Sequence, residues 1–232
     1  MRLHRLLVVV LSLLAVQQAR AAVSLISGPG TPVANPNNQR YYADPYNVDA
    51  VFYWTERTSY TLPADLVVSI LPPGSFPADS TSHSNDNSLT VPSGSTIDSY
   101  LLNYDPQSGS VVARFHFDDP IAGLITNSRD TAANDHFMLS DYLINPLVPP
   151  ANIPTAHYDA RGIEPDAGDY VHWFGPNDIE LHIGASSPGD QVRVITMAQA
   201  PEPATVAVLA LGLPAILFRR RPLACGAHAA RA

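Results

Sequence analysis

Residues 97–126 read IDSYLLNYDPQSGSVVARFHFDDPIAGLIT, and this stretch decides the fold. It contains three runs rich in apolar and β-branched residues, separated by Asp-Pro turns, which is typical of short strands. In the middle run the odd-numbered positions from Val111 to Phe117 are apolar, whereas Arg114 and His116 occupy even positions. Since side chains alternate between the two faces of a strand, this run predicts a strand with one buried face.

Similar runs continue on both sides of this stretch. A helix fits only within 131–144, because prolines are frequent elsewhere. The last two strands flank a Ser-Pro-Gly-Asp turn, which predicts a hairpin. The predicted strands are 51–54, 57–62, 66–71, 97–104, 110–117, 121–126, 179–183 and 191–196. We therefore expect an all-β fold, an antiparallel β-sandwich of jelly-roll-like form, over residues 49–200. A loop-rich segment at 22–48 and a long polar loop at 72–96 complete the body.

The N-terminal end of the chain has the pattern of a secretory signal peptide. A basic start is followed by 6–16, which is apolar except for Ser12, and then by Ala19 and Ala21 at the positions that signal peptidase accepts. An apolar helix of this length spans about 16 Å, against a hydrocarbon core of ~30 Å. We expect a signal helix at 1–21 that is cleaved after Ala21, rather than a membrane anchor.

The C-terminal end has three features in a fixed order: Pro201-Glu202-Pro203, the apolar run 204–218, and Arg219-Arg220-Arg221. The apolar run predicts a short hydrophobic helix that crosses a membrane only marginally, and the arginines hold its end on the cytoplasmic side. We therefore expect a chain that pauses in the inner membrane while its body lies outside.

This tail, residues 201–221, resembles the PEP-CTERM sorting signal, and residues 222–232 extend beyond it. The resemblance implies recognition by an exosortase in a Gram-negative bacterium, processing near Pro201 to Pro203, and delivery of the body to the cell surface or extracellular matrix. Much of 50–200, including 97–106, 115–125 and 187–196, resembles a group of uncharacterised PEP-CTERM proteins. That second resemblance implies the same architecture and destination, and no catalytic role.

Charge restricts the partners of the body. Residues 22–200 contain six arginines and no lysine against 20 acidic residues, a net charge of −14 with neutral histidines. Nucleic acids and anionic membrane surfaces select basic proteins, so neither is expected as a partner. The body also lacks cysteine, because Cys225 is the only one in the chain. An exported domain of this kind depends on its apolar core, or on bound metal, for stability.

Acidic residues near predicted turns are candidate calcium ligands, because calcium prefers carboxylate oxygens. These candidates are Asp118, Asp119, Asp159, Glu164, Asp166 and Asp169. They form no Asp-x-Asp-x-Asp-Gly loop, and an acidic solvated rim explains them equally well. A second metal hypothesis joins Glu180 and His182, which share one face of a predicted strand, with His116 on the polar face of another. Surface histidines without a ligand are the alternative.

Aromatic residues on or near loops suggest a platform for stacking sugars, although such residues also fill sandwich cores. They are Tyr41, Tyr42, Tyr46, Tyr53, Trp54, Trp173 and Phe174. The chain contains no Gly-x-Ser-x-Gly turn, His-Glu-x-x-His pair or phosphate-binding loop. We expect a non-enzymatic surface or matrix protein with a structural or adhesive role and no obligatory cofactor. The alternatives are a carbohydrate-binding module assisted by calcium, and a secreted hydrolase.

Overall fold

The computed structural model describes residues 22–39, 41, 49–71, 89–106, 108–126, 135–153, 162–163, 169–186 and 189–198. The chain divides into two compact units, Met1–Ala198 and Gln199–Ala232, and every described residue belongs to the first. The predicted signal helix and the predicted hydrophobic tail helix lie outside the described residues. Within the described ranges, no helix has both the length and the apolar character needed to cross a membrane.

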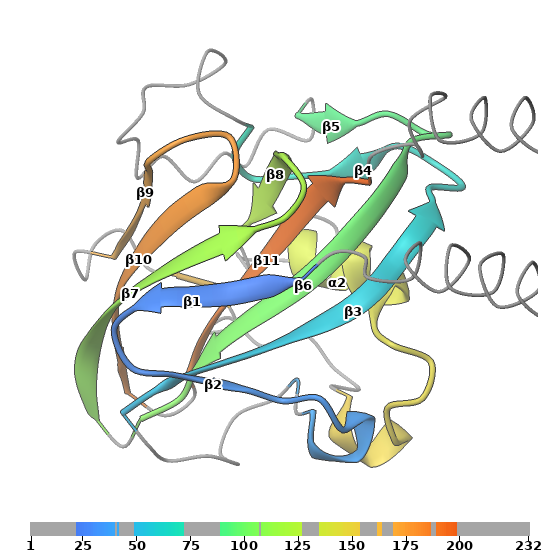
Figure 1. Cartoon of the computed structure of the whole chain (residues 1–232). Helices are drawn as coiled ribbons and strands as arrows, with labels where there is room; N and C mark the ends of the chain where they lie inside the picture. The colour runs from blue at the N-terminus through green and yellow to red at the C-terminus, as the bar shows by residue number, and fades with distance from the viewer. Residues whose placement is uncertain are drawn as a thin grey trace, which may run out of the picture. The chain divides into compact units, whose positions relative to one another are not determined.

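Two main sheets form the body, which confirms the predicted all-β sandwich (Figure 1). Sheet A is antiparallel throughout and has the order β1-β7-β10-β9. Its strands are β1 (Val23–Ser27), β7 (Ser108–Phe117), β10 (Asp178–Ser186) and β9 (Tyr170–Trp173). Sheet B has the order β2-β3-β6-β11-β8, with β2 parallel to β3 and the other pairs antiparallel. Its strands are β2 (Gly30–Pro32), β3 (Val51–Thr61), β6 (Thr96–Tyr104), β11 (Asp190–Met197) and β8 (Ile121–Ile125).

The main core lies between the two sheets. The predicted alternation in β7 is confirmed, because Val111, Ala113, Phe115 and Phe117 are buried, whereas Arg114 and His116 are half-buried. Facing strands of sheet B contribute Tyr53, Tyr100, Leu102 and Val194, among others. Phe115 meets Tyr53 edge-on, with ring centroids 5.3 Å apart. Interdigitation of the two inner faces is the usual way in which a sandwich buries its apolar side chains.

A second apolar layer covers the other face of sheet B. This layer brings Trp54, Leu101 and Ile195 from the sheet together with Phe137 and Leu143. It explains why β6 is buried at every position after Thr96, a pattern that no half-exposed strand has. The short elements that carry or adjoin this layer are α2 (His136–Ser140), η2 (Asp141–Leu143), η3 (Pro150–Asn152), η1 (Pro36–Asn38) and the small sheet of β4 (Leu66–Val67) and β5 (Thr90–Val91).

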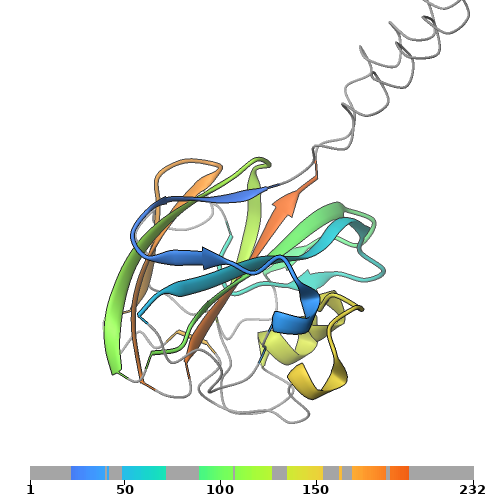
Figure 2. The ribbon, with the colours of Figure 1, turned by 60° about the horizontal axis from the view of Figure 1, so that its bottom comes forward.

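Helix α2 and the 3-10 turn η2 lie within 131–144, where the sequence allowed a helix, whereas the 3-10 turns η1 and η3 lie outside it. The side chain of Asp135 caps α2 by accepting from Met138 N at 3.1 Å. Figure 2 shows η1 beside this helical segment. There Asn152 Nδ2 donates to the carbonyl oxygens of Asn37 and Gln39, at 3.1 Å each.

The predicted hairpin of 179–183 and 191–196 is wrong. Strand β10 pairs with β7 and β9 in sheet A, whereas β11 pairs with β6 and β8 in sheet B. Both strands point alternate apolar residues into the same core, so their alternation does not distinguish a hairpin from a crossover between sheets. Gly189 marks the crossing, since a Cβ there would overlap the carbonyl oxygen of Tyr104 on β6.

Other strand boundaries differ from the prediction. The predicted strands at 51–54 and 57–62 form one strand, β3, with register shifts after Thr55 and Arg57. The predicted strand at 66–71 reduces to β4 and an isolated bridge between Ile70 and Leu124. Strands β1, β2, β5 and β9 lie where the sequence predicted loops or no element. The shortest of them, β2 and β5, have too few residues for alternation to be recognised.

Candidate functional site

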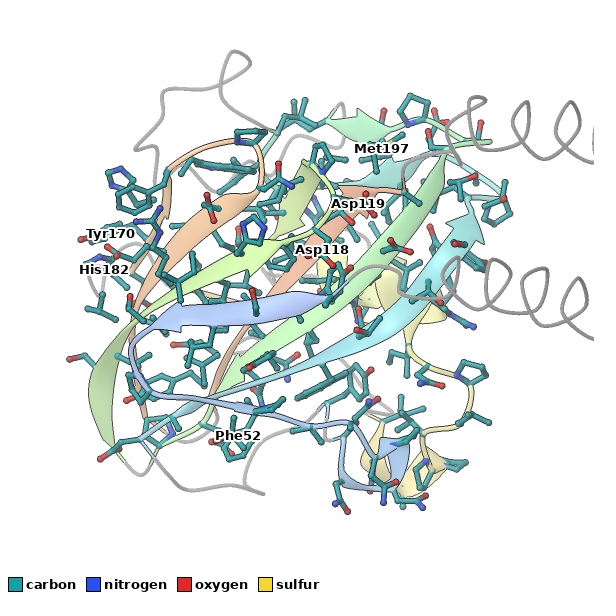
Figure 3. All side chains as sticks on the ribbon, viewed as in Figure 1. Phe52, Asp118, Asp119, Tyr170, His182 and Met197 are labelled. Atoms are coloured by element: carbon teal, nitrogen blue, oxygen red, sulfur yellow. The ribbon has the colours of Figure 1, made fainter. Side chains whose placement is uncertain are left out.

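The outer face of sheet A is the candidate functional site. This face consists of the side chains that point away from the core on the neighbouring strands β7, β10 and β9, together with that of Phe174, which directly follows β9. Figure 3 shows two of them, Tyr170 and His182, side by side at the edge of this sheet. The residues of this face are Val112, Arg114, His116, Tyr170, His172, Phe174, Asp178, Glu180 and His182.

Two histidine–carboxylate pairs lie on the outer face. His116 Nδ1 donates to Asp178 Oδ1 at 2.9 Å, from the directly opposite position on the next strand. His182 Nε2 donates to Glu180 Oε1 at 2.8 Å along the same strand. The His116 side chain is 43% exposed, and the other three are between 23% and 26% exposed. Both carboxylates therefore have a partner within the face while remaining accessible to solvent.

Two ring pairs occupy the same face. Tyr170 stacks on His182, its cross-strand neighbour, with centroids 4.0 Å apart and planes 17° apart. His172 stacks on Phe174 at 4.5 Å and 23°. Because each ring lies against another, these side chains hold one another in fixed orientations.

Arg114 completes the face and has an unusual environment. Its guanidinium carbon lies 3.9 Å from the centroid of Phe174, a cation–π contact. Glu180 is its cross-strand neighbour, but the Glu180 carboxylate bonds His182 instead. The Nε atom of Arg114 is shielded from solvent and has no hydrogen-bond partner in the part of the chain that the structure describes. The side chain is therefore held by a ring and not by a carboxylate.

The predicted metal ligands do not come together among the described residues. Asp118 accepts from Ala22 N at 2.8 Å beyond one end of β7, whereas Asp169 accepts from Gly184 N at 2.6 Å near the other end. The structure places His116 with Asp178, and Glu180 with His182, as two separate pairs. In the described ranges no group of three His, Cys, Asp or Glu side chains has the arrangement of a metal site. Asp159, Glu164 and Asp166 lie outside these ranges.

Most of the predicted aromatic platform belongs to the interior. Tyr53 and Trp173 are buried in the main core, and Trp54 Nε1 donates to the buried Tyr41 hydroxyl at 2.9 Å. Phe174 is the exception among the described candidates, being 46% exposed on the outer face. Tyr42 and Tyr46 lie outside the described residues. Tyr170 and His172 were not among the predicted site residues, although their alternation with the buried Val171 and Trp173 marks them as outward-facing.

A buried ion pair lies under α2, on the other face of sheet B. Arg193 Nε donates to Glu56 Oε2 at 2.7 Å, and Arg193 Nη2 donates to Glu56 Oε1 at 2.9 Å. Arg193 also donates to the Ser140 hydroxyl and to Asp141 Oδ1, the latter at 3.3 Å. Although burial disfavours the charge, the carboxylates of Glu56 and Asp141 raise the pKa of Arg193. Both side chains of the pair are fully buried, so we assign it to the attachment of α2 to the sheet.

A buried serine–histidine contact also has a structural explanation. Ser69 Oγ lies 2.9 Å from His136 Nδ1 and accepts from Thr126 N at 3.1 Å. Both side chains belong to fully buried residues, and burial lowers the pKa of His136. A nucleophile has to be reached by its substrate, so this pair joins β8 to α2 rather than forming a reactive site.

Comparison with known proteins found no matching family model, no similar curated protein and no similar solved structure.

Proposed function

We propose that this chain is an exported protein, delivered by an exosortase to the surface or extracellular matrix of a Gram-negative bacterium. There its β-sandwich serves as a non-enzymatic structural or adhesive component. Signal peptidase and the exosortase are its partners during export, and the inner membrane holds it transiently through the C-terminal hydrophobic run.

The sequence of both ends supports the proposed destination. The N-terminal end has the basic and apolar start, with Ala19 and Ala21, that signal peptidase recognises. The C-terminal end has the features of an exosortase substrate, Pro201 to Pro203 followed by an apolar run and Arg219 to Arg221. A body without cysteine, stabilised by two apolar layers, needs no disulfide after export.

The outer face of sheet A supports the proposed adhesive role. It presents charged groups, imidazoles and a phenol on three adjacent strands, which are stiff because they are paired and packed on a core. Polar groups held rigidly on a sheet lose little entropy when they bind a partner. The face therefore suits contact with a hydrogen-bonding surface such as a polysaccharide.

The export test is the mass and location of the mature protein in cells with and without the exosortase. We expect loss of residues 1–21 in both, and additional cleavage near Pro201 to Pro203 only where the exosortase is present. Recovery of the intact chain from the cytosol would contradict the proposal.

The outer face also favours a second candidate, a polysaccharide-binding module. Its test is retention of the protein on immobilised polysaccharides, with and without a calcium chelator. Chelation should abolish retention if the acidic residues, such as Asp118 and Asp119, hold calcium. Release of reducing sugar from the same polymers would indicate the third class, a hydrolase.

A further inference from the structure

We propose that the outer face of sheet A binds polysaccharides whose sugars carry carboxylate groups, and that Arg114 contacts the carboxylate. The inference rests on the proposed adhesive function and names the class of ligand that this face recognises.

Arg114 differs from the other arginines that the structure describes. Arg57 donates to the carbonyl oxygens of Leu143 and Tyr142, and Arg193 forms the buried ion pair with Glu56. Within the described ranges Arg114 forms no hydrogen bond and no ion pair, and its one specific contact there is with the ring of Phe174. The guanidinium of Arg114 is therefore not bonded to any carboxylate among the described residues.

The neighbouring carboxylates bond histidines and not Arg114. Glu180 lies directly across from Arg114, but its carboxylate accepts from His182. Asp178 accepts from His116. Because neither carboxylate bonds Arg114, the terminal nitrogens of Arg114 remain as donors for a group from outside.

The position of Arg114 determines which group suits it. The ring of Phe174 lies against the guanidinium, and His172 stacks on the same ring. A planar guanidinium that is held in place offers two parallel N–H groups, and a carboxylate accepts both. A lone hydroxyl accepts only one of them. The geometry therefore favours an acidic sugar over a neutral one.

The rest of the outer face fits the hydroxyl groups of such a polymer. The carboxylates of Asp178 and Glu180 can accept from sugar hydroxyls, and half-exposed His116 has a further ring nitrogen available. These groups lie on neighbouring strands, about 4.8 Å apart. The acidic body weakens each contact with a polyanion, so we expect measurable binding to depend on repeated sites along the polymer.

The test uses the full-length chain in a non-ionic detergent and affinity electrophoresis through gels that contain a polymer. The probes are polygalacturonate, alginate and hyaluronate, with methyl-esterified polygalacturonate as the uncharged match for the first. Retardation by at least one acidic polymer is expected. Esterification of polygalacturonate should weaken any binding to that polymer about tenfold or more, the value of a charge-assisted hydrogen bond.

Variants at Arg114 locate the contact. Arg114→Gln should lose about tenfold in affinity, and Arg114→Lys, which keeps the charge without the two parallel donors, should recover only part of it. Arg57→Gln is the matched control, since it removes a half-buried arginine from the other sheet and should bind like the native chain. Unchanged thermal unfolding of Arg114→Gln shows that the fold is intact.

Three results would overturn the inference: native binding by Arg114→Gln, equal binding to the ester and the acid, and no retardation by any of the acidic polymers. Retardation by neutral dextran alone would overturn the choice of an acidic sugar while leaving an adhesive function in place. Export is decided separately by the mass of the mature protein, so failure of one proposal does not imply failure of the other.

Discussion

Replacement of Arg193 by methionine should destabilise the body more than any other single change at an arginine that the structure describes. Methionine has a similar length and no charge. It removes both hydrogen bonds to Glu56 and the donors to Ser140 and Asp141. The Glu56 carboxylate keeps one described donor, the Ser99 hydroxyl at 2.6 Å, and stays fully buried.

The size of the expected destabilisation follows from the buried Glu56 carboxylate, which loses its ion-pair partner. Loss of one partner from a buried ion pair costs about 3–5 kcal/mol. For a body of this size each kcal/mol corresponds to about 2–4 °C in Tm, so we expect a fall of roughly 6–20 °C. Urea unfolding followed by tryptophan fluorescence measures the free energy, because Trp54 lies in the layer beneath α2.

Two further variants separate the ion pair from loss of packing. Arg57→Met is the matched control, because Arg57 is half-buried and donates to the same helical segment, and it should cost only about 1 kcal/mol. Combining Arg193→Met with Glu56→Leu should cost less than the sum of the single changes, because no unpaired charge remains. A loss below about 1 kcal/mol in Arg193→Met, or additive single changes, would refute the reasoning.

Three other outcomes follow from the structure and from the sequence. Burial lowers the pKa of His136 below its ordinary value of 6.5, so the unfolded chain takes up a proton before the folded one does. Stability should therefore be complete above about pH 6.5 and fall as the pH drops towards the lowered value, and urea midpoints in His136→Gln should lose this dependence. Gly189→Ala should cost about 1–3 kcal/mol because the new methyl group overlaps the Tyr104 carbonyl, whereas Gly175→Ala, where the nearest atom is 3.9 Å away, should stay within about 0.5 kcal/mol; equal Tm values would contradict this account. Finally, Glu202→Ala should prevent cleavage of the proposed sorting tail, which mass spectrometry of the mature protein would detect. Normal cleavage would contradict recognition of Pro201-Glu202-Pro203 by an exosortase.

The sequence predicted which face of a strand is buried better than it predicted which strands pair with one another. Alternation in 111–117 correctly assigned the buried and exposed sides of β7, because that choice depends on residues close together in the chain. The pairing of β11 with β6 and β8 was missed, since the same alternation permits several partners. Consecutive burial along β6 was also not predicted, because it depends on the layer that α2 adds over the second face of sheet B.

In the candidate site, too, the sequence predicted features that depend on nearby residues and missed contacts between distant ones. The sequence placed Glu180 and His182 on one face of a strand and His116 on a polar face, and the structure agrees with both. It could not show that His116 bonds Asp178, or that Arg114 lies on Phe174, because these contacts join residues 60 or more positions apart. The pair of Arg193 and Glu56 is separated by 137 positions and was missed for the same reason.

The position of β11 has a consequence for the order of events in synthesis. It is the last strand of the sandwich in the chain, yet it lies between β6 and β8 in the interior of sheet B. A polypeptide threaded across a membrane from its N-terminus cannot close that sheet until residue 197 has emerged, and Pro201 follows almost at once. Until then β6 and β8 present open edges, to which another chain can pair. Under the proposed export, completion of the body and arrival of Pro201 therefore coincide, and an exosortase that cuts there would encounter a newly completed domain.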